Sequence, residues 1–243
     1  MRSVPRVRVA DVISTGPSSP EGAARSERAA RFVAFEGGEG SGKSTQCVRL
    51  ADALRAAGHE VVVTREPGGT ELGARIRALL LDPAATGLDA RAEALLYAAD
   101  RAQHVAEVVR PALARGAVVI TDRYVDSSLA YQGAGRSLDV GEVAELSRWA
   151  TGTLVPAMTV VLDVDPAVGL VRAGRVEAPD RLEAEPLDFH ERVRAGFLAL
   201  AAADSARYSV VDAALDVDVV EAAVRAAVEP VVAASSAPFR VAP

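Results

Sequence analysis

Short apolar runs alternate with longer amphipathic segments along the chain from residue 31 onward. The apolar runs predict five strands, at 31–36, 60–64, 117–121, 158–163 and 207–212. The spacing between them predicts helices, at 43–57, 70–80, 90–114, 125–133, 139–150, 166–174, 186–204 and 216–232. Val-rich strands separated by helices are typical of an α/β fold, with a five-stranded parallel sheet covered by helices on both faces. Ligands of such sheets bind beyond the carboxyl ends of the strands.

The two ends of the chain lack this alternation. An arginine-rich start is followed by S-T-G-P-S-S-P-E-G at 14–22, which breaks any regular element. A secretory signal would need a longer apolar core. We therefore expect a disordered extension at 1–30, a folded domain at 31–233 and a flexible tail at 234–243. The alternatives for the first segment are a targeting or regulatory arm and a start codon assigned too early.

Composition narrows the class of protein. A net charge of -6 argues against a general nucleic-acid binder, because such proteins carry an excess of basic residues. The single cysteine, Cys47, excludes an internal disulfide and is expected to be a small packing residue. No apolar run approaches the roughly 20 residues that a membrane span needs, so we expect no membrane partner.

The segment G-G-E-G-S-G-K-S-T at 37–45 lies between the first strand and the first helix. It matches G-x-x-x-x-G-K-[ST], in which glycines let successive backbone N–H groups turn inward around phosphate oxygens. Lys43 can reach the β- and γ-phosphates, and the Ser44 hydroxyl can ligate Mg²⁺. The alternative is a chance glycine-rich turn. Against it, Lys43 is the only lysine among 27 basic residues, kept where the broad fork of arginine would fit poorly.

Charged residues follow the next strands as well. Arg65 stands in T-R-E-P-G-G-T at 64–70, where it could bind an anion, although an ordinary surface arginine is the alternative. Asp122 ends the third apolar run and could hold Mg²⁺ beside the phosphate loop. Asp163, which ends the fourth run, is a rival on the same grounds. We favour Asp122 because its neighbour Arg123 could contact phosphate.

Two later segments could recognise a base. Tyr97 and Arg101 lie four residues apart on one helix face, so the ring could stack on a base while the guanidinium binds its edge. The alternative is a core tyrosine beside a solvated arginine. His104 is expected to be structural. Tyr131 and Gln132 lie in the segment that follows the predicted strand at 117–121. The amide of Gln132 could bind the edge of a base, or it could simply belong to a loop.

Three arginines lie within ten residues of a segment that a glycine and a proline interrupt, namely Arg172, Arg175 and Arg181. Such a segment, at about 172–183, suits an arginine-containing lid that brings guanidinium groups to transferring phosphates. The alternative is a charged surface loop, which the nearby acidic residues would favour.

Together these motifs resemble bacterial thymidylate kinase, in the family of P-loop nucleoside monophosphate kinases. The resemblance rests on the phosphate loop, T-R-E-P-G-G-T, Y-A-A-D-R-A-Q-H, D-R-Y-V-D-S-S-L-A-Y-Q-G and D-R-L-E, and covers about 31 to 220. It implies a P-loop NTPase fold and the reaction ATP + dTMP → ADP + dTDP, a step in dTTP synthesis. It also implies Mg²⁺, a cytoplasmic location and a homodimer.

The resemblance also implies a role for each matching position. The ATP phosphates would be held by the loop, Gly37, Gly38, Glu39, Gly40, Ser41, Gly42, Lys43, Ser44 and Thr45. Ser44 and Asp122 would organise Mg²⁺. The dTMP site would comprise Glu39, Arg65, Tyr97, Arg101, Arg123, Ser128, Tyr131 and Gln132. Within it Arg65 and Arg123 would hold the phosphate, Tyr97 would stack on thymine and Arg101 would donate to a thymine carbonyl.

The resemblance assigns catalysis to Lys43, Arg123 and the lid arginines Arg172, Arg175 and Arg181. Ser41 is neutral where some members carry a catalytic arginine in the loop, which groups this chain with members whose catalytic arginines come from the lid.

Two other activities remain open from the sequence. One is a kinase for another nucleoside monophosphate or for a deoxynucleoside, although R-E-P-G-G-T fits deoxynucleoside kinases poorly. The other is a partner-driven P-loop ATPase, which would need no monophosphate pocket. A Ras-type guanine-nucleotide switch is excluded, because the chain has no asparagine and no second lysine from which to build N-K-x-D.

Overall fold

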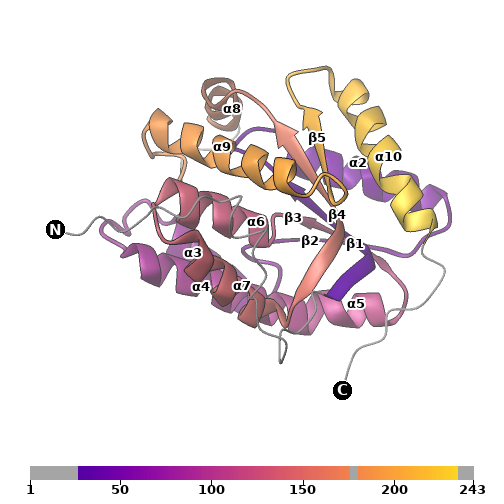
Figure 1. The fold of residues 1–243 in the computed structure, drawn as a ribbon, viewed down its shortest axis with the longest axis horizontal. Coiled ribbons are helices and arrows are strands. Elements are labelled where there is room, and N and C mark those ends of the chain that lie inside the picture. Colours follow the sequence, from indigo (N-terminus) through magenta and orange to yellow (C-terminus); the bar gives the residue numbers. More distant parts are fainter. Residues whose placement is uncertain (1–26, 176–179, 235–243) are drawn as a thin grey trace.

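The computed structural model describes residues 27–175 and 180–234, which form one five-stranded parallel sheet with helices on both faces (Figure 1). The strand order is β2-β3-β1-β4-β5. All five predicted strands are present, as β1 (Glu27–Glu36), β2 (Val61–Arg65), β3 (Val118–Asp122), β4 (Leu154–Asp163) and β5 (Tyr208–Asp212). The α/β prediction with a parallel sheet is therefore confirmed.

Two strands begin four residues earlier than predicted. β1 begins at Glu27 rather than at residue 31, and β4 begins at Leu154 rather than at residue 158. The two additions pair with each other, with Ala29 opposite Pro156 and a register irregularity after Ala29. Neither addition alone has the pattern of a strand, and each supplies the backbone partner of the other. The domain boundary predicted at residue 31 is thus wrong, because 27–30 belong to the sheet.

Three predictions fall partly outside the described residues. They are the N-terminal extension over 1–26, the lid over 176–179 and the tail over 235–243. Within the described part, the last helix ends at Ala233, where the folded domain was predicted to end.

The predicted helices are all present at the expected places. They are α2 (Lys43–Ala56), α3 (Glu71–Leu81), α4 (Ala90–His104), α5 (Arg110–Ala114), α6 (Val125–Ser128), α7 (Val140–Thr151), α8 (Pro166–Ala173), α9 (Leu187–Ala203) and α10 (Val217–Ala233). Two predicted helices are interrupted by π-helical turns, η1 (Val105–Val109) and η2 (Leu129–Gly135). The first precedes Pro111, which has no backbone N–H to continue the α-helical bonding.

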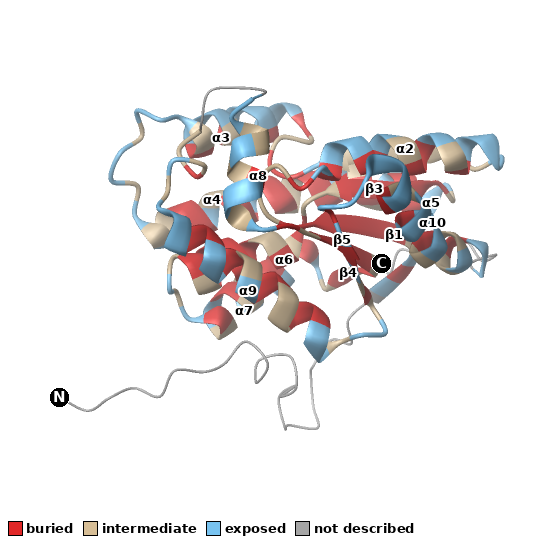
Figure 2. Cartoon of the chain, turned by 90° about the horizontal axis from the view of Figure 1, so that it is seen from above, coloured by how far each residue is buried: buried red, intermediate tan, exposed pale blue. Residues whose placement is uncertain are grey.

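The sheet divides the core into two sides, and its inner strands β3, β1 and β4 are buried on both faces (Figure 2). Val33 and Phe35 of β1 pack toward the side that carries α2 and α10. Phe32 and Ala34 pack toward the opposite side, against η1 and α5. The alternation along β1 explains why the strand is apolar at successive positions. A third cluster joins α9 and η2 to the β4 and β5 half of that side.

Charged residues gather where the parallel strands end. β1 ends at Glu36, β2 at Arg65 and β3 at Asp122, while β4 and β5 end at the paired residues Asp163 and Asp212. The register sets Arg65 directly opposite Asp122. This edge of the sheet is where an α/β fold binds its ligands.

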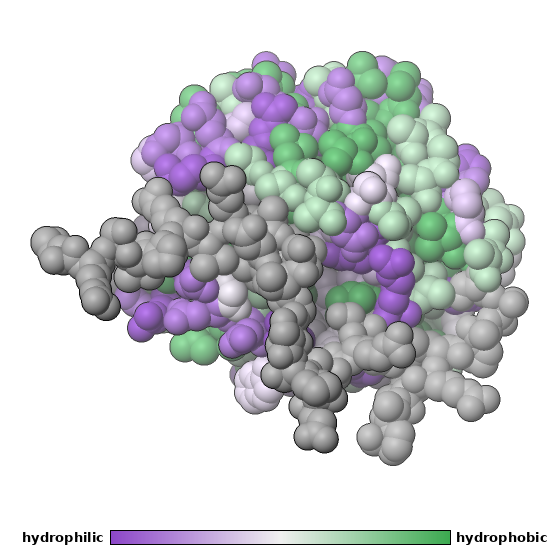
Figure 3. All heavy atoms as spheres, viewed as in Figure 1, coloured by the Kyte–Doolittle hydropathy of each residue, from purple (hydrophilic) through white to green (hydrophobic). Residues whose placement is uncertain are grey.

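The exposed large apolar side chains include two groups. One group lies on the adjacent helices α3, α4 and α7, as Leu72, Leu79, Leu95 and Trp149, with 82% of Trp149 exposed. The other comprises Leu215, Val217 and Val219 near the start of α10, where Figure 3 shows hydrophobic residues gathering at the upper right. In 27–175 and 180–234, no helix is both long enough and apolar enough to cross a bilayer.

Candidate active site

The phosphate loop turns sharply between β1 and α2. Gly37, Gly40 and Gly42 have φ values of 136°, 61° and 88°, which side chains other than glycine rarely adopt. Inside the turn, Nζ of Lys43 donates to the carbonyl oxygens of Gly37 at 3.2 Å and Gly38 at 2.7 Å. Burial and the nearby charge of Arg123 lower the pKa of Lys43. The loop backbone therefore surrounds the ammonium group of Lys43, which was predicted to bind phosphate.

The loop also packs directly on α8, the helix that leads into the predicted lid. A Cβ atom at Gly40 would overlap the carbonyl oxygen of Gly169 on α8, and one at Gly169 would overlap the carbonyl oxygen of Glu39. Only glycine permits this approach at either position. The contact places Arg172 of α8 beside the loop, where it lines the same cavity as Lys43 and donates to the carbonyl oxygen of Ala213 at 2.8 Å.

Ser44 and Asp122 lie together, with Oγ of Ser44 donating to Oδ2 of Asp122 at 2.6 Å. The rival Asp163 instead accepts two hydrogen bonds from Arg194, at 2.7 and 2.8 Å. A hydroxyl and a single carboxylate are hard oxygen donors, as Mg²⁺ prefers, and Mg²⁺ commonly takes its remaining ligands from water and substrate phosphates. The described segments contain no group of three or more His, Cys, Asp or Glu side chains that could hold a metal ion.

Arg123 joins the loop to the residues that the sequence predicts to bind the nucleoside. Its guanidinium donates to Oε1 of Glu39 at 2.9 Å and to the carbonyl oxygen of Gly37 at 3.1 Å. The guanidinium also lies 5.0 Å from the ring centre of Tyr131, whose hydroxyl donates to Glu39 at 2.6 Å. Although burial opposes ionisation, the charges of Arg123 and Lys43 lower the pKa of Glu39 to about 2. Glu39 is thus an anionic hydrogen-bond acceptor between two cations.

Glu36 holds the segment that carries Arg123. Its carboxyl group accepts from the backbone of Tyr124 at 2.9 Å and of Ser127 at 3.1 Å, and from Oγ of Ser127 at 2.6 Å. Arg123 itself has a φ of 72°, which is unusual for a residue with a side chain. Burial and the charge of Asp126 raise the pKa of Glu36 to about 8. The one sign of this role in the sequence is a charged residue at the end of an apolar strand.

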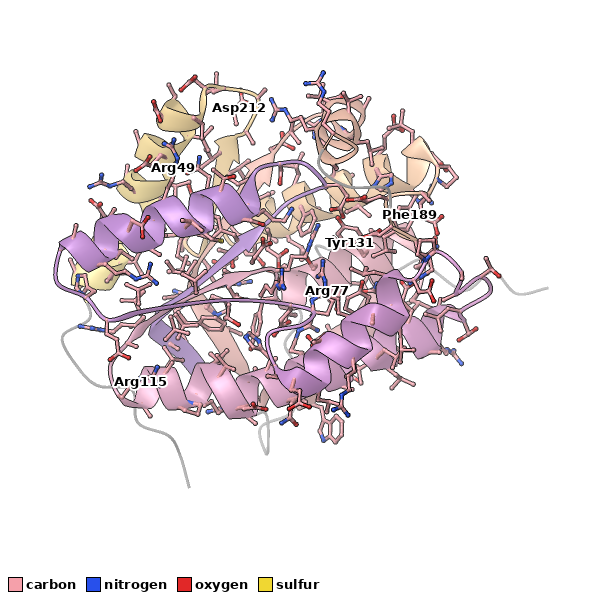
Figure 4. All side chains as sticks on the ribbon, turned by 180° about the vertical axis from the view of Figure 1, so that it is seen from behind. Arg49, Arg77, Arg115, Tyr131, Phe189 and Asp212 are labelled. Carbon is pink, nitrogen blue, oxygen red and sulfur yellow. The ribbon has the colours of Figure 1, made fainter. Side chains whose placement is uncertain are left out.

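A pocket lies between η2, α4 and the end of β3, with about 600 Å³ of empty space up to its open mouth. It brings together five predicted nucleoside residues from two separate segments, Tyr97, Arg101, Ser128, Tyr131 and Gln132. Arg77 of α3 also lines it, and Figure 4 shows Arg77 near the centre of the molecule, with Tyr131 close by.

Arg101 is buried, so the alternative that it is a solvated surface arginine is wrong. Nε donates to Glu66 at 2.7 Å, and the terminal nitrogens donate to the carbonyl oxygen of Tyr124 at 3.0 Å and to Ser147 at 3.5 Å. Each terminal nitrogen keeps one further N–H, because a guanidinium has five. His104 bridges Glu66 and Thr64 with two 2.7 Å contacts, as expected for a structural histidine.

The lid arginines occupy different places. Arg172 faces the phosphate cavity, and Arg175 is exposed just beyond α8. Arg181 instead donates to the carbonyl oxygen of Leu80 at 2.8 Å and to Glu93 at 2.6 Å. The three side chains are therefore not gathered at the loop, and Arg172 is the one beside it.

Arg65 is exposed in the cavity that Lys43 and Arg172 line, which we call the phosphate cavity. Its side chain makes no hydrogen bond or ion pair with the described residues.

Three other residues of the candidate site were not predicted from the sequence. Arg77 lines both the phosphate cavity and the nucleoside pocket, and donates to the carbonyl oxygen of Pro67 at 3.2 Å. Glu66 and Glu93 anchor arginines from other segments. Their only sign in the sequence was their position within motifs that supplied other candidates.

Comparison with known proteins gives consistent matches. Residues 35–224 match a family model described as thymidylate kinase. Thymidylate kinase of Solidesulfovibrio magneticus is 58% identical over 200 residues, covering 79% of this chain and 96% of the relative. Thymidylate kinase of Clavibacter michiganensis is 56% identical over 206 residues, covering 84% of this chain and 97% of the relative. A crystal structure of thymidylate kinase from Ehrlichia chaffeensis aligns with a TM-score of 0.67 and 34% identity, covering 82% of this chain and 97% of that one.

Proposed function

The chain belongs to the thymidylate kinase family, and from this premise we propose that it transfers the γ-phosphoryl group of ATP to dTMP, giving ADP and dTDP. Such a reaction supplies the diphosphate from which dTTP is made for DNA synthesis. The assignment of individual residues within the site is part of the same proposal.

One observation carries the proposal. The nucleoside pocket and the phosphate cavity share four lining residues, Glu39, Glu66, Arg77 and Arg123. A monophosphate bound in the pocket would therefore direct its phosphate toward the loop that holds the ATP phosphates. A simple ATPase has no need of a second pocket joined to the first in this way.

The proposed chemistry depends on alignment and charge, since phosphoryl transfer needs little covalent help from the protein. Lys43 and the loop amides would hold the ATP phosphates. Arg65, Arg77 and Arg123 would hold the acceptor phosphate in line with the γ-phosphorus. Ser44 and Asp122 would hold Mg²⁺, whose charge would offset that of the phosphates. No dedicated general base is required.

Base recognition would use the inner part of the pocket. Tyr97 would stack on thymine, and the remaining N–H groups of Arg101 would donate to a thymine carbonyl. Ser128, Tyr131 and Gln132 would complete the nucleoside wall. Because Tyr131 already donates to Glu39, the sugar would meet an anionic acceptor at this end of the pocket.

Among the lid arginines, Arg172 is the first candidate for stabilising the transition state, because it lines the phosphate cavity. We expect at least one of Arg172→Ala, Arg175→Ala and Arg181→Ala to lower turnover by about 10³–10⁵, the effect of removing such arginines elsewhere. Wild-type turnover in all three variants would refute the role of the lid.

The test of the proposed function is ADP formation from ATP and Mg²⁺ with dTMP, dUMP, dCMP, dGMP, AMP or no acceptor. We expect fast turnover with dTMP and little without an acceptor. Preference for another monophosphate would assign a different nucleotide kinase, and hydrolysis that is independent of acceptor would assign an ATPase. Either result would refute the proposal.

We also propose a cytoplasmic homodimer, as the family resemblance implies. The exposed apolar group on α3, α4 and α7 supports an interface there, because it includes the almost fully exposed Trp149. Light scattering on Trp149→Glu should show a monomer. Leu215→Glu is the matched control from the other apolar group and should leave the dimer intact. A dimer in the first variant would contradict this interface.

A further inference from the structure

We propose that Glu93 orients the side-chain amide of Gln132 and thereby makes the pocket select thymine over cytosine. The inference rests on the proposed function, since it concerns the base of the monophosphate that this pocket accepts. Glu93 acts through Gln132, so it is a positioning residue that determines specificity.

Glu93 lies on α4 with 1% of its surface exposed and is surrounded by donors. Its Oε1 accepts from Nε2 of Gln132 at 2.9 Å and from Nε of Arg136 at 3.3 Å. Its Oε2 accepts from Arg136 at 3.2 Å and from Arg181 at 2.6 Å. Although burial opposes ionisation, the hydrogen bonds from Gln132, Arg136 and Arg181 lower the pKa of Glu93. The carboxylate is therefore anionic at neutral pH and has no proton to donate.

An acceptor without a proton fixes the direction of its amide partner. The two ends of a glutamine amide are nearly the same size and differ in that one donates and the other accepts. Because Glu93 can only accept, the NH₂ end of Gln132 must face it. The carbonyl Oε1 of Gln132 is then turned away from Glu93, and no described residue donates to it. Gln132 lines the nucleoside pocket, so a free acceptor is available to the ligand there.

The free acceptor matches one edge of thymine. Thymine presents a donor at N3–H next to an acceptor at O4, whereas cytosine presents an acceptor at N3 next to a donor at its N4 amino group. Oε1 of Gln132 would accept from N3–H, while the free N–H groups of Arg101 would donate to O4. Cytosine would place acceptor against acceptor and donor against donor. Uracil has the same edge as thymine, so this pair of residues does not separate dTMP from dUMP.

Replacing Glu93 would allow the amide of Gln132 to reverse its direction. With glutamine at position 93, the new side chain can present either an NH₂ or a carbonyl group to Gln132. Gln132 can then turn its own NH₂ end into the pocket, where it would suit N3 of cytosine. Arg136 provides a matched control, because it pairs with Glu93 and Glu185 but is absent from the lining of the nucleoside pocket.

The experiment compares kcat/KM for dTMP and dCMP in wild type, E93Q and R136Q, with thermal unfolding of each protein. We expect E93Q to raise the ratio of dCMP to dTMP by at least about tenfold, since a site that matches the hydrogen bonds of one substrate strongly rejects a mismatched one. R136Q removes an ion-pair partner of Glu93 and leaves the contact with Gln132, so its ratio should stay near that of wild type. If E93Q fails to fold, E93Q/R136Q removes both charges of the pair and should show the same change.

An unchanged ratio in folded E93Q or E93Q/R136Q, with both substrates losing activity in parallel, would overturn the inference. An equal change of ratio in R136Q would also overturn it, because loss of packing would then be the cause. Neither result bears on the proposed function, which is tested by the acceptor preference of the wild-type protein.

Discussion

Replacing Glu66 by alanine should be among the most damaging single changes outside the phosphate loop. The carboxylate of Glu66 and the guanidinium of Arg101 are each 1% exposed and lie 2.7 Å apart. Glu66 also contacts the fully buried His104 at 2.7 Å. Glu66→Ala would leave the charge of Arg101 buried without its counter-ion, because the other hydrogen bonds of Arg101 are to a carbonyl and a hydroxyl.

Removing one partner of a buried ion pair costs about 3–5 kcal/mol of unfolding free energy. For a domain of this size each kcal/mol shifts Tm by about 2–4 °C, so we expect Glu66→Ala to lower Tm by about 6–20 °C. The same change should raise KM for dTMP if Arg101 binds the base as proposed, because its guanidinium would lose the ion pair that fixes its orientation.

Thermal and urea unfolding of Glu66→Ala, Arg101→Met and the double variant provide the assay. The double variant should recover part of the loss, since replacing a whole buried pair by apolar side chains is often nearly neutral. A loss below about 1 kcal/mol in Glu66→Ala, or a double variant no more stable than the single one, would refute this reasoning.

Three further predictions concern the loop, the acceptor phosphate and pH. Lys43→Ala should lose most turnover while remaining folded, and near-normal rates would remove the loop from the mechanism. Arg65→Ala should raise KM for dTMP with little change in kcat, because a phosphate contact is made in ground and transition states alike; a change confined to the KM for ATP would contradict this role. Because burial and the charge of Asp126 raise the pKa of Glu36 from 4.5 to about 8, the folded protein retains a proton that the unfolded chain loses. The stability that Glu36 contributes is thus complete below pH 4.5 and is lost as pH rises to about 8. Urea unfolding should show a flatter decline between pH 5 and 8 in Glu36→Gln than in wild type, and equal slopes would oppose the assignment.

The fold was largely predictable because its information is local. Val-rich runs marked each strand, and periodic apolar positions marked each helix, to within a few residues at most ends. The additions to β1 and β4 were not predictable in this way, since Ala29 and Pro156 form strand only through pairing with each other. The π-helical turn η1 likewise depends on how the helix accommodates Pro111, which the spacing of apolar residues does not reveal.

The candidate site was predictable where a residue stands in a motif that indicates ligand chemistry, and unpredictable where a residue serves only to bind another residue. Arg101, Tyr131 and Gln132 stood in motifs whose chemistry points to a base or a phosphate. Glu66 and Glu93 serve arginines that are 35 and 88 positions away in the chain, and a glutamate in a sequence carries no mark of its partner. Only the fold reveals which opposite charges it brings together in the interior.

The solitary lysine of this chain has a practical consequence for protein chemistry. Apart from the α-amino group, Nζ of Lys43 is the one primary amine that an acylating reagent can modify, and it lies inside the phosphate loop. Its lowered pKa leaves more of it as the nucleophilic free amine at a given pH. The extent of acylation, followed by mass spectrometry, would thus report directly on occupancy of the loop, with bound nucleotide acting as the protecting group.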